Sequence, residues 1–335
     1  MEVRKLQLIG GSSYMVSLPK TWVKSNELKQ GDDIFLQVED SVITLYPKSF
    51  RDFARVTSVQ IDELPRLDER FVRRYIYALY LQGIDEIVIT DEKINARAVS
   101  KIGEIVKDLI GMEIIDASEG KVVLKCLTST DFDVYGVVRR MTQIIQSMIE
   151  TVIDGIEKGD TEALKDIQNL EKDSDRLYLL AVRQEHRLVR EFSSPSKWNE
   201  LRLILGIRTV AKLLEEISDA LYNFSTYAIE MKYDELKEVK KYFEKLNVAF
   251  EKLSKAYFNS NVSLSEESIE DLEKLEETLL SNMKGSVYYR LALETLLSAC
   301  RHMKSIGEIA FNKSVRESLR EMRKSEKMRS EVDTR

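Results

Sequence analysis

The sequence predicts a multidomain protein in which a small β-rich unit and a small α/β unit precede a long all-α region. Three observations lead to this organisation. Residues 1–49 alternate between short extended runs and clusters of turn-forming residues. Residues 50–130 alternate between strand-like and helix-like segments, which is typical of a small α/β domain. From Asp131 onward turn residues are sparse and helical periodicity dominates.

The first unit contains two pairs of strands separated by a short helix. Gly10 and Gly11 open a loop cluster between the first two strands, and Pro19 is suited to the first turn of the helix. Gly31-Asp32 turns the chain before the last pair. The expected order is strand, strand, helix, strand, strand, over residues 4–9, 14–17, 19–26, 34–38 and 42–46. A unit this small buries little apolar surface by itself and contains no cysteine, so we expect a second copy to complete it.

The string SLPKTWVKSNELKQGDDIFLQVED resembles the SpoVT/AbrB swapped-hairpin family. Ser17-Leu18-Pro19-Lys20 and Gly31-Asp32 stand where that family has its turn motif and its "GD" pair, and the resemblance covers residues 2–48. It implies a dimer with interlaced hairpins whose basic residues face DNA. The cations that it assigns to promoter DNA are Arg4, Lys5, Lys20 and Lys24. Residues 1–49 hold six basic and six acidic side chains, so a dimerisation module with solvated lysines is the alternative.

The composition indicates a cytoplasmic protein. The net charge of −6 argues against general coating of nucleic acid by the whole chain. The sequence contains no run of eighteen apolar residues and no secretory signal at its start, so we expect no membrane-embedded segment. Cys126 and Cys300 lie far apart in different predicted elements and are expected to be free thiols in a reducing compartment.

The middle segment, residues 50–130, shows no chemistry of its own. Its expected order is strand, helix, strand, helix, strand, strand, over residues 56–61, 67–82, 85–90, 95–110, 112–116 and 121–127. No glycine-rich phosphate loop follows either of the first two strands, so a nucleotide site is not expected. We interpret this unit as a spacer or interface domain.

Six long helices are predicted in the remaining chain. They cover residues 132–158, 161–192, 197–231, 234–259, 265–283 and 286–325. Asp160 or Thr161 can cap the second helix, and Ser265 is expected to open the fifth. Short loops make successive helices antiparallel neighbours, and the set divides into two three-helix bundles, residues 131–232 and 233–328.

The two bundles carry related acidic strings. KLLEEISDALYN (residues 212–223) corresponds to RHMKSIGEIAFN (301–312), and EKDSDRL (171–177) corresponds to EKLEETL (273–279). These strings resemble the PhoU family of phosphate-signalling proteins, over residues 132–315. The resemblance implies metal ligands at Glu171, Asp175, Glu215, Asp219, Glu273, Glu277 and Glu308. Lys304 stands where that family has an acid, which supplies a competing cation in the second half.

The spacing of these acids agrees with a shared ion but does not require one. Side chains four apart on a helix point the same way, and like charges there repel by about 0.2–0.5 kcal/mol unless a cation lies between them. Glu215 and Asp219 lie roughly opposite the apolar face of the third helix, so we expect them on the surface. Ordinary solvated acids are the alternative. Oxygen ligands suit Mg, Mn, Ca or Fe ions, and no organic cofactor is expected.

No enzymatic centre is predicted. A di-iron carboxylate enzyme needs two Glu-x-x-His motifs, but His186 and His302 follow Arg183 and Ala299 at that spacing. The resemblances instead favour a regulator of phosphate uptake and phosphate homeostasis, a transcriptional regulator that binds DNA and has a PhoU-like sensing module. The resemblance to PhoU also implies the phosphate ABC transporter or its regulators as partners. The alternative is a dimeric scaffold that does not bind DNA and docks on a phosphate transporter or a signalling kinase.

Overall fold

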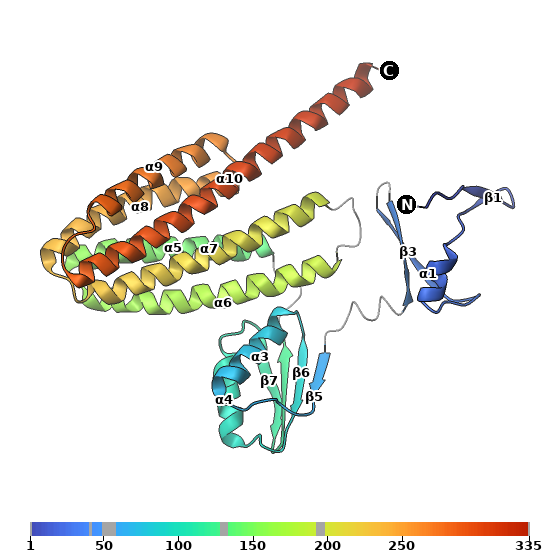
Figure 1. Ribbon diagram of the computed structural model, residues 1–335, viewed down its shortest axis with the longest axis horizontal. Helices are drawn as coiled ribbons and strands as arrows, with labels where there is room; N and C mark the ends of the chain where they lie inside the picture. Colours follow the sequence, from blue (N-terminus) through green and yellow to red (C-terminus); the bar gives the residue numbers. More distant parts are fainter. Residues whose placement is uncertain (1, 40–41, 49–57, 128–132, 192–197, 334–335) are drawn as a thin grey trace.

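The computed structural model describes residues 2–39, 42–48, 58–127, 133–191 and 198–333. The chain passes from a small β-rich part through an α/β part into a region of long helices (Figure 1). This is the predicted order of fold types, so the predicted multidomain class is confirmed. Among the described residues no helix is long and apolar enough to cross a membrane.

The N-terminal part consists of two antiparallel hairpins and one short helix. β1 (Gln7–Ile9) pairs with β2 (Ser13–Met15), and β3 (Ile34–Glu39) pairs with β4 (Val42–Pro47). Helix α1 (Lys20–Ser25) lies between the hairpins in sequence. Gly10 and Gly11 have positive φ angles of 63° and 77°, which explains why glycines fill the β1–β2 turn.

This part leaves an unusual amount of apolar surface uncovered. Every residue of β1 and β2 is exposed, and α1 buries none of its side chains. The large apolar side chains that are at least 47% exposed here are Val3, Leu6, Leu8, Ile9, Tyr14, Met15, Val16, Leu36, Val38 and Ile43. Exposed apolar side chains in this number normally mark an interface. Within the described residues, neither apolar core of the chain includes a residue of this part.

The α/β part is a four-stranded sheet with two helices. Its elements are β5 (Ser58–Ile61), α3 (Glu69–Leu81), β6 (Glu86–Thr90), α4 (Ala96–Val106), β7 (Met112–Ser118) and β8 (Lys121–Cys126). The sheet order is β5-β6-β8-β7, with β5 and β6 parallel and the other pairs antiparallel. Asp68 and Asn95 cap the two helices by accepting from backbone amides. Helix α4 ends at Val106 instead of the predicted Ile110, because the chain turns there to bury Leu109.

The long helices follow the predicted periodicity closely. They are α5 (Val134–Lys158), α6 (Thr161–Glu191), α7 (Trp198–Ala228), α8 (Tyr233–Asn259), α9 (Val262–Ser281) and α10 (Val287–Asp333). The two groups of three helices share one continuous apolar core, with α7 packed along α10 and α5 along α8. The end of α10 projects past the other helices (Figure 1).

The ends of two helices test the predicted caps. The Asp160 carboxylate accepts hydrogen bonds from the amides of Glu162 and Ala163, so Asp160 caps α6 as predicted. The predicted start of α9 at Ser265 is wrong. The helix begins one turn earlier, where Asn261 accepts from the Leu264 amide, and Ser265 is fully buried inside it. Asn261 and Ser265 are both favourable caps by residue type, and only the backbone conformation distinguishes them.

Candidate cation site

Two helices of the first bundle bring their acidic motifs together. Glu171 and Asp175 of α6 lie with Asp219 of α7, with one oxygen of each carboxylate within 4.8 Å of the others. Asp219 also forms a second such group with Glu215 and Glu216. Helices α6 and α7 pack side by side in opposite directions, and each carries its acidic motif near its middle. The two motifs therefore lie at the same level along the helix pair. Spacing on each helix and pairing between the helices together create the cluster.

The cluster is half-buried, which corrects the expectation that these acids lie on the open surface. The Glu215 side chain is only 15% exposed. One carboxylate oxygen of Asp175 is fully enclosed and has no hydrogen-bond partner among the described residues. The helical wheel of α7 correctly places these acids away from its apolar face. It does not show that α6 packs over the side of α7 on which they lie. An enclosed carboxylate oxygen without a donor is costly unless a cation or a proton satisfies it.

Burial and mutual repulsion make the ionised cluster unfavourable. The pKa of Asp175 is raised to about 7, first by burial and then by the charges of Glu171, Asp219 and Glu215. Burial is also the main cause of the raised pKa values of Glu171, Glu215 and Asp219. A proton on one of these carboxylates, or a cation beside them, would offset this repulsion.

One protein cation already enters the cluster from the side. Lys212 contacts the carboxylates of Glu215 and Glu216, the latter at 2.7 Å, and lies 5.4 Å from the centre of the Tyr178 ring. The hydrogen bond from Lys212 lowers the pKa of Glu216. Glu171, Asp175 and Asp219 lie in no ion pair that the structure shows among its described residues. These three carboxylates fit a hard divalent ion, which takes oxygen ligands.

The second bundle does not repeat this arrangement. Glu273, Glu277 and Glu308 are exposed, and no group of three potential ligands appears there among the described residues. Glu276 instead occupies the half-buried position, where Arg301 and Lys304 bind it at 2.8 and 2.9 Å. These two hydrogen bonds lower the pKa of Glu276, and the bond from Arg301 has the larger effect. The second half is thus neutralised by the protein's own cations.

Sequence reasoning missed Glu216 and Glu276. Both directly precede or follow an acid that belongs to the motif, so a spacing rule passes over them. The doubled acids at 215–216 and 276–277 were the available signal.

His302 of α10 is half-buried, and burial is the main cause of its lowered pKa. Its Nδ1 atom makes no hydrogen bond among the described residues, and Glu216 lies near enough to favour its charged form.

The four cations assigned to DNA are all solvent-exposed. Lys20 and Lys24 stand one turn apart on α1, and thus on one side of that helix. Lys5 is exposed, and Arg4 forms a 2.5 Å ion pair with Glu2. Their assignment to DNA stays a prediction.

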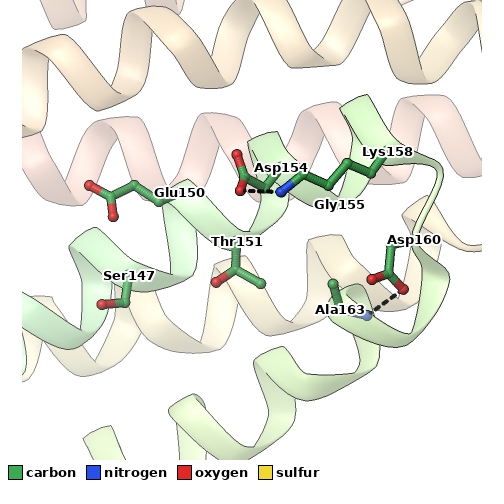
Figure 2. A pocket seen from close by; sticks show the side chains of 8 residues that line it. All are labelled: Ser147, Glu150, Thr151, Asp154, Gly155, Lys158, Asp160 and Ala163. Atoms are coloured by element: carbon green, nitrogen blue, oxygen red, sulfur yellow. Dashed lines mark hydrogen bonds and ion pairs between the residues drawn. The ribbon is translucent and has the colours of Figure 1, made fainter.

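A shallow hollow of about 350 Å³ lies beside the turn between α5 and α6, away from the carboxylate cluster. Figure 2 shows its lining side chains, with Glu150 and Asp154 on α5 and Asp160 at the start of α6. Lys158 forms a 2.9 Å ion pair with Asp154 at its rim. The hollow contains none of the predicted site residues.

Comparison with known proteins gives a match in the N-terminal part and another over α5 to α7. Residues 138–228 match the family model described as PhoU domain, and residues 7–52 match the model described as antidote-toxin recognition MazE, bacterial antitoxin. The chain therefore carries a PhoU domain behind a MazE/AbrB-like N-terminal domain. The crystal structure of PhoU from Pseudomonas aeruginosa aligns with 55% of this chain and 96% of its own, at 15% identity and a TM-score of 0.47. No curated protein sequence matches.

Proposed function

We propose that this protein regulates phosphate uptake and phosphate homeostasis, with a helical region that binds a cation and an N-terminal dimer that binds promoter DNA. The observation that carries the proposal is the combination of a PhoU domain and a MazE/AbrB-like domain in one chain. On this proposal the chain acts as a regulator and not as an enzyme.

The proposed DNA contact rests on exposed charge and on exposed apolar surface together. Pairing two N-terminal parts would cover the apolar side chains of their hairpins and leave the cations of α1 outside. Two copies would present Arg4, Lys5, Lys20 and Lys24 twice, related by a two-fold axis. A DNA site read by such a dimer should be an imperfect two-fold repeat.

The proposed cation site rests on the half-buried carboxylates of the first bundle. Glu171, Asp175 and Asp219 would hold the ion, with Glu215 and Glu216 next to it. The bound ion would supply positive charge to an enclosed acidic cluster and so favour the packed arrangement of α6 and α7. Mg, Mn, Ca and Fe are the ions that such a ligand set suits. Glu273, Glu277 and Glu308 are weaker candidates because they lie exposed in the neutralised second bundle.

Gel-shift titrations of the full chain on promoter DNA from phosphate-transporter genes test the DNA part. We expect Lys24→Ala to weaken binding to all sequences and to lower the slope of log affinity against log salt by about one. Lys29→Ala is the matched control, since Lys29 is exposed in the same part but is not an assigned contact.

The opposite result supports the scaffold hypothesis. If the full chain binds promoter DNA no better than an unrelated acidic protein does at low salt, the N-terminal part only dimerises. The helical region would then act by docking on a phosphate transporter or a signalling kinase.

A further inference from the structure

The α/β part is joined to helix α6 by a buried polar contact. Arg183 of α6 has a side chain only 1% exposed, and it enters the α/β part at the end of α3. Its guanidinium donates to the carbonyl oxygens of Tyr80 and Ile84 at 2.7 and 2.8 Å and also binds Asp85. A buried arginine with several partners fixes both the distance and the orientation of the two parts.

Neighbouring residues of α6 reinforce this joint. His186 Nδ1 lies 2.6 Å from the Leu81 carbonyl oxygen, and Arg187 binds Asp85 at 3.1 Å. The accepting carbonyls belong to the last turn of α3 and the turn after it, where a helix leaves carbonyl groups unpaired and carries partial negative charge. The Arg183 guanidinium of α6 thus caps the end of α3 from outside the α/β part. Figure 1 shows the α/β part lying against α6.

The same helix carries the candidate cation ligands. Asp175 and Arg183 are eight residues apart on α6, a rise of about 12 Å. Within the joint itself, Glu185 of α6 is 10% exposed and pairs with Arg208 of α7 at 3.4 Å, so the joint also contacts the helix that carries Asp219. A change in how α6 packs on α7 therefore moves the residues that hold the α/β part.

We propose that the α/β part is a rigid relay, fixed to α6 by Arg183, His186 and Arg187, that transmits the state of the helical region to the N-terminal domain. This inference rests on the proposed function and assigns a role to residues 58–127, which lie outside both family matches. In the chain the α/β part stands directly between the N-terminal part and the long helices: β4 ends at Pro47, β5 begins at Ser58 and α5 begins at Val134.

Distance measurements between spin labels test the joint itself. One label is attached at Ser100→Cys on α4 of the α/β part and the other at Lys255→Cys on α8 of the helical region. Cys126 is replaced by Ser so that it takes no label. Cys300 is only 1% exposed and should stay unlabelled. In dimers that hold one labelled and one unlabelled chain, so that only the two labels of one chain are measured, we expect a single narrow distance. Arg183→Met should broaden the distribution at least twofold, and Asp85→Asn serves as the milder variant if Arg183→Met does not fold. Asp116→Asn is the matched control, because Asp116 pairs with Lys121 in an exposed bridge of the same sheet.

Affinity for promoter DNA with and without Mn²⁺ tests the relay. We expect Mn²⁺ to change the affinity of the full chain at least fivefold and Asp85→Asn to abolish most of that change, with basal DNA binding retained. The relay is overturned if the distances stay narrow in both variants, or if the Mn²⁺ effect persists once the joint is loosened. It is also overturned if the unmodified chain binds both Mn²⁺ and DNA without any effect of one on the other, although the proposed function then stands. An unmodified chain that binds no DNA or no Mn²⁺ overturns the proposed function and the relay together.

Discussion

At the scale of single residues, Asp175 shows how packing creates a charge problem that its helix alone does not have. On an isolated α6 its carboxylate would be solvated beside Glu171. Against α7 one of its oxygens loses water and gains no donor among the described residues, while Asp219 and Glu215 of α7 approach. Its pKa of about 7 expresses that cost. The protein can meet this cost with a proton or with a bound cation.

The stability of the metal-free protein should therefore depend on pH through Asp175. An acid whose pKa is raised by folding stabilises the folded state below its unfolded pKa, near 3.8, and loses that contribution as pH rises through about 7. We expect Asp175→Asn to raise the melting temperature at pH 8 in EDTA and to flatten its dependence between pH 5 and 8. Asp173→Asn, a change of an exposed neighbour, should do neither. If the melting temperatures of wild type and Asp175→Asn change with pH by the same amount, this interpretation is contradicted.

Asp219 should dominate cation binding because it belongs to both carboxylate groups. We expect Asp219→Asn to weaken Mn²⁺ binding to the full chain at least tenfold, measured by isothermal titration calorimetry. Helical content measured by circular dichroism should not change, since removing a half-buried charge relieves repulsion. Asp234→Asn, at an exposed acid of α8, controls for net charge. Equal Mn²⁺ affinity in both variants would mean that the cluster is an ordinary acidic surface.

At the scale of secondary-structure elements, the helices show which end signals decide a boundary. Asp160 follows a glycine in the left-handed conformation, and this combination ends α5 and starts α6 within two residues. At α9 the residue types of both Asn261 and Ser265 suit a helix N-cap. Asn261 is the N-cap because the backbone is extended there. Ser265 then turns its hydroxyl onto the Asn261 carbonyl from inside the helix.

The cap of α9 gives a prediction about stability. Replacing Asn261 with Ala removes the acceptor for the Leu264 amide, and we expect this to lower the free energy of unfolding by about 1 kcal/mol. Ser263→Ala is the control, since that hydroxyl only reaches a side chain on the exposed surface at 3.3 Å. Urea denaturation of the two variants measures the difference, and equal midpoints would show that Asn261 does not cap α9.

At the scale of the whole molecule, the parts differ in how well one chain can complete them. The α/β part and the helical region each bury a continuous apolar core. The N-terminal part instead exposes apolar side chains on both hairpins. A second copy that interlaces with the first would bury them, as the swapped-hairpin resemblance predicts.

The dimer should therefore depend on the N-terminal hairpins. We expect Val38→Asp, at a side chain 68% exposed in the single chain, to convert a dimer of the full chain into monomers in sedimentation velocity experiments. Burying an unpaired carboxylate in the shared core would be strongly unfavourable. Val248→Asp places the same charge at a 54% exposed valine of α8 and should leave the dimer intact. If Val38→Asp sediments as wild type does, these hairpins are not the interface.

The order and type of the elements could be predicted from the sequence, because periodicity, turn residues and caps act within a few residues of each other. The sequence also placed Glu215 and Asp219 on one side of α7, since spacing fixes the direction of a side chain around its own helix. Which residues lie against that side of α7 depends on how the helices pack, and no local pattern encodes that packing. The α6 helix encloses the acids of the first bundle, whereas in the second bundle Arg301 and Lys304 neutralise Glu276. The joint between Arg183 and the end of α3 was equally beyond sequence reasoning, because its partners are about a hundred residues apart and no local spacing rule connects them.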